Sequence, residues 1–231
     1  MAALTPTRPT RRGAIGEVLS VSEFPKLLLS LPWLAAKPRG NGQPVLMVPG
    51  YGADERSLAL LARYLRYLGY RTWGWGLGRN TGNVYTLLPK VIERVNEVSA
   101  GEPVFLIGWS LGGYIAREAA REIPDRIRHV ITLGTPVVGG PKYTLVAARY
   151  EERGYDLDAI EADVEAREAN PLRVPVTAMY SRRDGIVSPA ACIDRVNPQV
   201  EHVRIATRHF GFGFSPVVYG RIADTLAGAT G

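Results

Sequence analysis

Residues 104–123 read VFLIGWSLGGYIAREAAREI, and this stretch decides the fold. Val104–Ile107 is a short, continuous apolar run, which is typical of a strand buried on both faces of a sheet. Leu111–Ile123 places apolar residues at helical spacing, so a helix is expected directly after the strand. The turn between them, residues 108–112, is a G-x-S-x-G pattern. Such a turn holds its serine in a strained backbone conformation and projects it above the sheet edge.

Strand and helix patterns alternate on both sides of this turn. The apolar runs predict strands at Val45–Val48, Arg71–Trp75, Val104–Ile107, Val130–Leu133, Val174–Tyr180 and Val200–Ala206. The 3.6-residue periodicity predicts helices at Glu55–Leu68, Asn83–Ser99, Leu111–Ile123 and Pro216–Ala227. This alternation indicates an α/β fold, with a mostly parallel central sheet and helices on both of its faces.

The turn around Ser110 and the elements that flank it resemble the α/β-hydrolase superfamily, in particular its small esterases and lipases. The resemblance covers residues 44–228. It implies an α/β-hydrolase fold in which Ser110 is the nucleophile of a Ser-His-Asp triad. It also implies that an acid and then a histidine follow the serine in chain order.

The chain has three histidines, and their positions in the sequence indicate which one can be the catalytic base. His129 precedes the strand at 130–133, too early to follow the acid. His202 lies in or at the start of a strand, where its side chain points into a sheet face. His209 follows the last strand in the glycine-rich loop RHFGFGF, at the carboxyl end of the sheet, where a proton-shuttling imidazole is expected. We therefore expect His209 to be the catalytic base.

Two aspartates compete for the third position of the triad. Asp184 ends the run VPVTAMYSRRD, just after a predicted strand, where its carboxylate can accept a hydrogen bond from His209 Nδ1–H. Asp194 lies in a short predicted helix at 189–196, with Ser188 placed to cap it. That position points Asp194 away from the site, so Asp184 is the expected acid.

The early loop VLMVPGYGADERS, residues 45–57, matches the place where related lipases carry the oxyanion loop. The match implies that the backbone N–H groups of Tyr51 and Leu111 hold the oxyanion. Pro49 stands where those lipases commonly have histidine, but the expected donor is main chain. Gly50 and Gly52 would let the backbone come close to a substrate carbonyl.

Two stretches beside this framework suggest walls for a pocket. Residues 136–171 form an insert with helical patterns at about 144–153 and 157–169. In the family this position often holds a cap, so we expect a small helical lid here. Residues 73–80 interleave three glycines with two tryptophans. These tryptophans either wall the pocket or pack against the core.

The first 43 residues form a basic arm, and residues 44–231 the expected catalytic domain. Six of the 28 Lys and Arg residues, but only two of the 22 acids, lie in the first forty positions. The remainder is nearly balanced in charge, so nucleic-acid binding is not expected despite the net charge of +6. Residues 1–16 show no periodicity and are expected to lack regular structure. Residues 17–36 predict a short amphipathic helix that either packs on the body or lies on a membrane surface.

Cysteine usage and apolar content limit the class of protein further. The single Cys192 can form neither an internal disulfide nor a zinc site, so we expect no metal or other cofactor and a reducing, cytoplasmic compartment. Residues 27–35, LLLSLPWLA, approach the hydrophobicity of a secretory signal but lie late and contain Pro32. Secretion and peripheral membrane association stay open. No run approaches the length of a membrane span.

These patterns predict a serine hydrolase that cleaves a small-molecule or lipid ester through an acyl-enzyme. An acyltransferase or thioesterase with the same triad is the first alternative, because the acceptor choice depends on pocket hydration. A non-catalytic binding protein of the same fold is the second. The complete set of Ser110, Asp184 and His209 argues against it, since a binding module needs none of the three.

Overall fold

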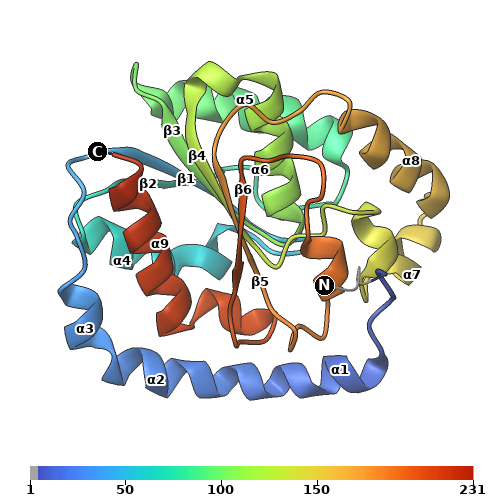
Figure 1. Ribbon diagram of the computed structural model, residues 1–231, viewed down its shortest axis with the longest axis horizontal. Helices are drawn as coiled ribbons and strands as arrows, with labels where there is room; N and C mark the ends of the chain where they lie inside the picture. The colour runs from blue at the N-terminus through green and yellow to red at the C-terminus, as the bar shows by residue number, and fades with distance from the viewer. Residues whose placement is uncertain (1–4, 231) are drawn as a thin grey trace.

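A computed structural model describes residues 5–230, in which six parallel strands form one sheet with helices on both faces (Figure 1). The sheet order is β2-β1-β3-β4-β5-β6. The strands are β1 Pro44–Val48, β2 Arg71–Gly74, β3 Val104–Trp109, β4 Ile127–Leu133, β5 Val176–Tyr180 and β6 Val200–Arg204. The predicted α/β class with a parallel sheet is confirmed, and every strand pair is parallel.

The two faces of the sheet carry separate apolar cores, which strand β1 illustrates. Val45 and Met47 belong to the core beneath helices α4 (Ala59–Tyr67) and α9 (Pro216–Gly228). Leu46 and Val48 belong to the opposite core, beneath α5 (Val84–Ser99) and α6 (Leu111–Glu122). Because alternate side chains of a strand point to opposite faces, a strand covered on both sides must be apolar throughout.

Since all six strands are parallel, the loops that follow them meet at one edge of the sheet. The loop after β1 carries Tyr51, and the turn after β3 carries Ser110. The loops after β5 and β6 carry Asp184 and His209. The topology therefore gathers four of the predicted site residues at the carboxyl edge.

Short helices complete the body. The insert after β4 holds the 3-10 helix η4 (Gly140–Tyr143), α7 (Ala147–Glu151) and α8 (Leu157–Arg167). Its helices are shorter than the sequence pattern indicated. Single-turn 3-10 helices lie at η2 Glu55–Leu58, η3 Pro124–Arg126, η5 Pro189–Cys192 and η6 Phe210–Gly213.

The N-terminal arm is more helical than expected. It runs through α1 (Arg11–Gly16), the 3-10 helix η1 (Glu17–Ser22), α2 (Glu23–Leu29) and α3 (Leu31–Ala35), along the lower edge of Figure 1. The prediction that residues 1–16 lack regular structure is wrong for α1, and residues 1–4 lie outside the described range. Thr10 caps α1 by accepting a hydrogen bond from Gly13 N–H, and Gly13 packs directly on Gly185.

The arm's orientation also differs from the amphipathic pattern. Of the apolar residues expected to form one packed face, only Leu27 is buried. Val18, Leu19, Val21, Phe24, Leu28 and Leu31 are all exposed. Glu17, Ser20 and Glu23 are turned toward the body as well, and Glu17 meets backbone N–H groups there. Within residues 5–230, no helix combines the length and apolarity that crossing a bilayer requires.

Candidate active site

Ser110 lies in the sharp turn between β3 and α6. Its φ of 54° and ψ of −124° are unusual for a residue with a side chain, so the backbone is strained there. Two bonds hold this conformation: Ser110 N–H donates to Leu133 O at 2.8 Å, and Thr135 Oγ1 donates to Ser110 O at 2.9 Å. The strained turn raises the serine above the sheet edge.

The two glycines of the turn are required by close backbone contacts. A Cβ on Gly108 would collide with the backbone of Gly112 and Gly113. A Cβ on Gly112 would collide with the carbonyl oxygens of Val48 and Pro49. The strand and the helix can approach this closely only because both positions lack a side chain.

The loop after β1 lies directly beside the serine. A Cβ on Gly50 would lie 3.3 Å from Ser110 Cβ, so the two backbones are nearly in contact. Tyr51 follows in this loop and lines the same cavity as Ser110 and Leu111. Leu111 is the first residue of α6, and N–H groups in the first turn of a helix have no intrahelical acceptor. This arrangement suits two backbone donors aimed at a developing oxyanion.

Asn80, which the sequence analysis did not single out, braces this loop. Its side-chain Nδ2 donates to Pro49 O at 2.8 Å, and its backbone carbonyl oxygen accepts a hydrogen bond from Gly52 N–H at 2.8 Å. Asn80 N–H donates to Ala53 O, also at 2.8 Å. Asn80 is 1% exposed, so these bonds are shielded from water and fix the loop that carries Tyr51.

Asp184 and His209 are joined at the same edge of the sheet. His209 Nδ1 lies 2.7 Å from Asp184 Oδ2, and both side chains are buried. Asp184 Oδ1 accepts hydrogen bonds from the N–H groups of Ile186 (2.9 Å) and Val187 (2.8 Å). The carboxylate is therefore held in place and orients the imidazole, leaving Nε2 for proton transfer.

His209 and Ser110 line one cavity. Among the side-chain hydrogen bonds of the described residues, none joins the His209 ring to Ser110. Aromatic rings pack around the imidazole, with Trp109 at 5.7 Å and Phe210 at 6.0 Å between ring centroids. Asp184 and His209 are 8% and 3% exposed, so the pair is largely shielded from water.

Glu17, in the arm, is bonded to the backbone of the loops that carry Asp184 and His209 and was missed by sequence reasoning. Its Oε1 accepts hydrogen bonds from Gly185 N–H (2.8 Å) and His209 N–H (3.1 Å). Its Oε2 accepts one from Phe210 N–H at 3.0 Å. The side chain is buried, with the residue 3% exposed. One carboxylate thus links the loop of the expected acid to the loop of the expected base.

The other two histidines lie outside the site. His129 Nε2 lies 2.9 Å from Thr177 Oγ1, and burial lowers the pKa of His129. His202 Nε2 accepts a hydrogen bond from Asp194 N–H at 2.9 Å. Burial lowers the pKa of His202, the charge of Arg117 lowers it further, and the charge of Asp194 opposes both. Both rings make structural contacts within the sheet and its connections.

Asp194, the rival acid, is engaged elsewhere. It forms a buried ion pair with Arg117 on α6 and accepts hydrogen bonds from the N–H groups of Val196 and Asn197, each at 2.9 Å. Burial alone would raise the pKa of Asp194, but the charge of Arg117 and these hydrogen bonds outweigh it, so the pKa is lowered. Its role is structural.

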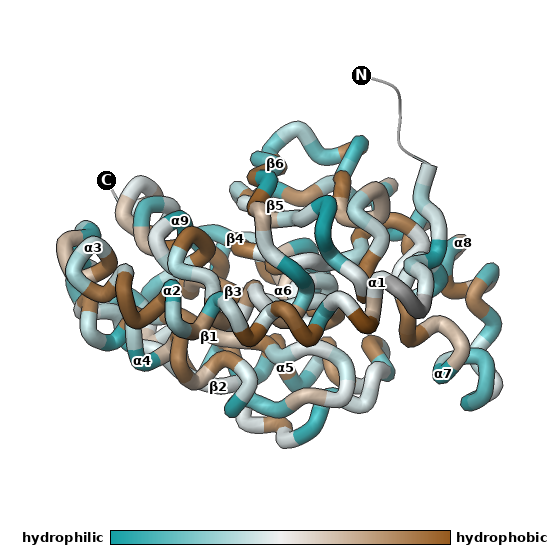
Figure 2. The backbone as a smooth tube through the Cα atoms, turned by 90° about the horizontal axis from the view of Figure 1, so that it is seen from below, coloured by the Kyte–Doolittle hydropathy of each residue, from teal (hydrophilic) through white to brown (hydrophobic). Residues whose placement is uncertain are grey.

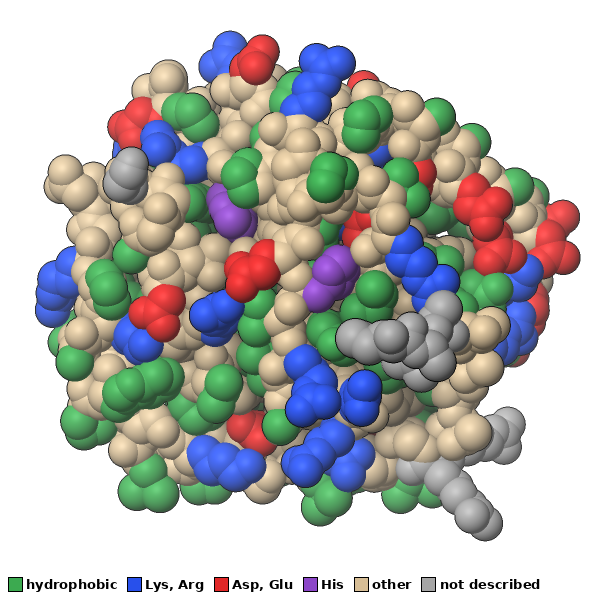
Figure 3. Space-filling model, in the orientation of Figure 1, with side chains coloured by type: hydrophobic (Ala, Val, Ile, Leu, Met, Phe, Trp, Pro, Cys, Tyr) green, Lys and Arg blue, Asp and Glu red, His purple; other side chains and the backbone are tan. Residues whose placement is uncertain are grey.

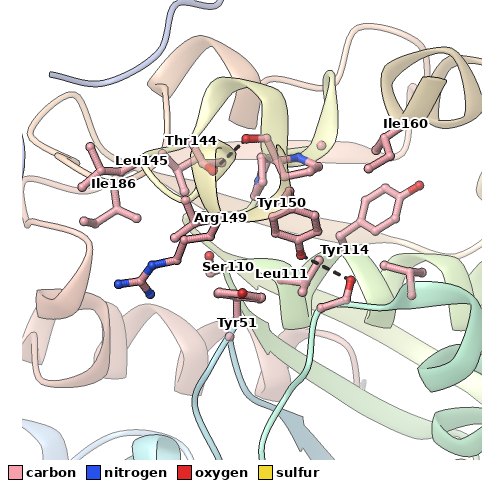
Figure 4. A pocket seen from close by; sticks show the side chains of 18 of the residues that line it. Tyr51, Ser110, Leu111, Tyr114, Thr144, Leu145, Arg149, Tyr150, Ile160 and Ile186 are labelled. Carbon is pink, nitrogen blue, oxygen red and sulfur yellow. Dashed lines mark hydrogen bonds between the residues drawn. The ribbon is translucent and has the colours of Figure 1, made fainter. Parts of the chain in front are cut away.

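Above Ser110 lies a cavity of about 380 Å³ lined mainly by apolar and aromatic side chains. Figure 4 shows Ser110 between Tyr51 on one side and Leu145, Arg149 and Tyr150 on the other. Tyr150, on α7, packs its ring 5.3 Å from that of Tyr51 and donates from its hydroxyl to Gly82 O at 3.3 Å. The insert after β4 therefore covers the serine.

The tryptophan-rich stretch takes no part in the cavity lining. Trp75 is fully buried in the core under α5, and its Nε1 donates to Gly78 O at 2.9 Å. The sequence left open whether the tryptophans of residues 73–80 line the pocket or pack in the core, and Trp75 packs in the core. Within residues 5–230, no group of three or more His, Cys, Asp or Glu side chains is placed to hold a metal ion. Cys192 is buried, and burial raises the pKa of its thiol.

The chain was compared with protein families and with solved structures. The alpha/beta hydrolase fold family matches residues 43–182. Among solved structures, a metagenome-derived lipolytic enzyme from the pair LipS and LipT is 15% identical, with a TM-score of 0.65 over 84% of this chain and 96% of that chain. A monoacylglycerol lipase from Paleococcus ferrophilus is 17% identical, with a TM-score of 0.62 over 82% and 97%.

A third structure, the naproxen esterase of Bacillus subtilis, is 14% identical, with a TM-score of 0.60 over 82% of this chain and 85% of that chain. At these identities the likeness is one of fold. No curated protein matches the chain.

Proposed function

The chain belongs to the alpha/beta hydrolase fold family, and from this premise we propose that it is a serine hydrolase that cleaves carboxylic esters, with Ser110, His209 and Asp184 as its triad. The observation that carries the proposal is the 2.7 Å bond between His209 Nδ1 and Asp184 Oδ2, at the rim of the cavity that Ser110 also lines. A buried acid–histidine pair beside a strained serine is the arrangement that acyl transfer needs.

In the acylation step, Ser110 Oγ attacks the ester carbonyl carbon while His209 Nε2 takes the hydroxyl proton. The carbonyl π electrons move to oxygen, and the backbone N–H groups of Tyr51 and Leu111 hold the resulting oxyanion. Asp184 stabilises the imidazolium. The oxyanion then collapses, the bond to the leaving alcohol breaks, and His209 gives its proton to that alcohol.

In the deacylation step, water takes the place of the alcohol. His209 removes one of its protons as the oxygen attacks the acyl carbon, and the bond to Ser110 Oγ breaks on collapse. The proton returns to Ser110, and a carboxylic acid leaves. Every proton is carried by His209.

The cavity supports an ester with an apolar acyl part. Its walls are mainly apolar, and about 380 Å³ is a volume typical of small-ligand sites. We propose that α7 and α8 act as a lid that limits acyl length, because Tyr150 and Ile160 of these helices line the cavity.

Active-site labelling and ester hydrolysis test the proposal. A fluorophosphonate probe is expected to label the native chain, and Ser110→Ala should fold normally but lose both labelling and hydrolysis of p-nitrophenyl esters. Ser22→Ala, which removes an exposed hydroxyl from the arm, serves as the matched control and should keep both. Labelling that persists in Ser110→Ala would refute the assignment.

A further inference from the structure

The outward face of the arm exposes an unusual number of large apolar side chains. Val18, Val21 and Leu29 are 72%, 73% and 84% exposed. We call the whole set the arm's apolar face; it consists of Ile15, Val18, Leu19, Val21, Phe24, Leu28, Leu29, Leu31 and Trp33. Figure 2, seen from below, shows the arm crossing the near side of the body with hydrophobic stretches along it. Contiguous exposed apolar surface of this extent marks an interaction site.

The arm cannot hide this face by rotating on the body, because its other side is fixed. Glu17 accepts three backbone N–H groups of the body, and Leu27 and Leu34 are buried in the core under α9. The bonds of Glu17 and the packing of the two leucines set the rotation of the helices. The apolar face is therefore held outward by the fold.

Positive charge borders the apolar face. Arg183 and Arg208 line a hollow together with Leu19, and Lys26, which also lines it, pairs with Glu23 at 3.0 Å. The only acids of the first forty residues, Glu17 and Glu23, are turned inward and are 3% and 8% exposed. Figure 3 shows Lys and Arg side chains gathered on the lower part of the molecule, next to hydrophobic side chains at its edge. The surface thus combines apolar side chains with a basic border.

An aromatic residue stands at the far end of the same face. Trp33 is 49% exposed, and Lys37 Nζ lies 4.4 Å above its ring. Lys37 Nζ also pairs with Asp224 Oδ2 at 2.7 Å, so the exposed indole is the group that can enter a lipid boundary, where tryptophan is favoured because its ring is amphipathic.

We propose that the arm's apolar face docks on the surface of an anionic lipid bilayer. Apolar side chains would enter the boundary between head groups and acyl chains, and Arg183 and Arg208 would lie against anionic head groups. The charge argues for lipid over a second copy of this chain. A two-fold contact whose axis crosses the arm would bring each basic border against its own copy, which like-charge repulsion disfavours.

The docked face adjoins the mouth of the cavity. Phe210 is 46% exposed, lines the cavity and is bonded through its N–H to Glu17. This step rests on the proposed function. A substrate that enters the cavity past Phe210 would come from the docked bilayer, so we expect the substrates of Ser110 to be esters dissolved in the bilayer. The docking itself does not depend on the reaction.

Vesicle co-sedimentation of the full-length chain tests the docking. Vesicles of phosphatidylcholine mixed with phosphatidylserine should bind the protein, and phosphatidylcholine alone should bind it more weakly. Raising the salt concentration should weaken binding to the anionic vesicles, since salt screens the basic border. Absence of binding to anionic vesicles, or equal binding to both kinds at all salt concentrations, would overturn the proposal.

A pair of matched variants locates the contact. Val18→Ser with Val21→Ser removes apolar surface from the arm, and Val196→Ser with Val217→Ser removes the same groups from positions that are 58% and 56% exposed elsewhere. The arm variant should lose about tenfold or more in vesicle affinity, and the control should lose none. Both should keep the melting temperature of the native chain. An arm variant that binds like the native chain would refute the contact.

Two further measurements separate the remaining explanations. Ser110→Ala should bind vesicles as the native chain does; if it keeps vesicle binding but the native chain hydrolyses no ester, the docking stands and the proposed function fails. Sedimentation velocity identifies the other occupant of the face. A native dimer that the arm variant converts to monomer, with no vesicle binding by either, would show that a second copy covers the face and would overturn the proposal.

Discussion

Glu17 Oε1 accepts a hydrogen bond from His209 N–H at 3.1 Å, although the two residues are 192 positions apart in sequence. The same oxygen accepts Gly185 N–H at 2.8 Å, directly after Asp184. A residue of the arm therefore sets the spacing between the loops of the acid and the base. Catalytic geometry of this kind tolerates little displacement, because rates fall steeply with small shifts of the reacting groups.

Replacing Glu17 by Gln should slow catalysis through positioning. The amide keeps one acceptor oxygen but turns an NH2 group toward backbone donors, so at least one N–H loses its partner, at a cost of about 1.5–3 kcal/mol. We expect kcat for a soluble p-nitrophenyl ester to fall about tenfold, with little change in KM, together with a lower melting temperature.

Glu23→Gln is the matched control for this prediction, since Glu23 is a buried arm residue whose described hydrogen bond is to Lys26. Its Cγ lies near Gly211, but its carboxylate accepts no described bond from the loops of Asp184 and His209. This variant should leave kcat unchanged. If Glu17→Gln lowered the melting temperature but kept full kcat at a temperature where it is folded, Glu17 would be structural only.

Asp184 and Asp194 should respond to the same substitution in opposite ways. Asp184→Asn removes the acceptor that orients His209, so kcat should fall by about 10⁴-fold while the fold persists. Asp194→Asn leaves Arg117 buried without its closest partner and should cost about 3 kcal/mol in the free energy of unfolding. Its folded fraction should keep normal kcat. Ester kinetics and urea unfolding of both variants test which aspartate is the acid of the triad. A loss of kcat in Asp194→Asn but not in Asp184→Asn would make Asp194 the acid.

Gly112→Ala should be among the most disruptive single substitutions in this chain. Its Cβ would strike the backbone of β1, which has no flexible end that can move aside. We expect a loss of at least about 3 kcal/mol in the free energy of unfolding and a loss of activity in what remains folded. Gly228→Ala, in α9, is the control: no neighbouring atom lies within 4 Å of its Cβ, so stability should be kept or slightly raised.

Stability should fall as the pH drops below neutral, and His202 should contribute to this fall. Its pKa is lowered in the folded state, chiefly by burial, so the unfolded chain binds a proton more readily. Stability from the neutral ring is therefore complete above the unfolded pKa of about 6.5 and declines as the pH falls from there toward the folded pKa. His202→Gln keeps an acceptor for Asp194 N–H without titrating.

Urea unfolding at pH 7.5 and at pH 5.5 measures this effect. The native chain should lose more unfolding free energy between the two values than His202→Gln does. Equal losses in both proteins would mean that His202 does not couple to folding in this range.

Shortening Tyr150 should broaden acyl-chain preference. Its ring packs on Tyr51 over the cavity, so Tyr150→Ala enlarges the space above Ser110. The ratio of kcat/KM for long over short p-nitrophenyl esters should rise by about tenfold. Tyr67→Ala, which removes a tyrosine ring that is 52% exposed on α4 and outside the cavity lining, should leave the ratio unchanged. An unchanged ratio in Tyr150→Ala would refute the lid's role in chain selection.

The sequence predicts the fold and the position of the site well because the deciding signals are local. Gly108 and Gly112 flank a serine between an apolar run and a helical pattern. In any parallel sheet, the carboxyl ends of the strands lie at the same edge. The positions of Ser110, Asp184 and His209 at one edge follow from that topology. Their chemical roles stay predictions, which the labelling and the paired aspartate variants address.

Glu17 and Asn80 were not predicted because their partners are backbone groups distant in sequence. Nothing near Glu17 indicates that N–H groups of residues 185, 209 and 210 converge on it. The same contacts explain why most of the arm's apolar residues face outward. Helical periodicity gives the two faces of a helix, but the body decides which face it accepts. Here the body offers three backbone N–H groups to Glu17 and an apolar site to Leu27 and Leu34.

The bonds of Glu17 also bear on the order in which the chain is made and becomes active. The ribosome releases the arm first, yet the three backbone groups that Glu17 accepts lie in the last quarter of the sequence. At usual rates of synthesis, roughly 10 to 40 seconds separate the appearance of Glu17 from that of His209. During that interval the arm has no docking site, and the loop that holds the imidazole does not exist. The bonds of Glu17 and the pairing of His209 with Asp184 therefore form together, so a chain that ends before His209 has neither complete set.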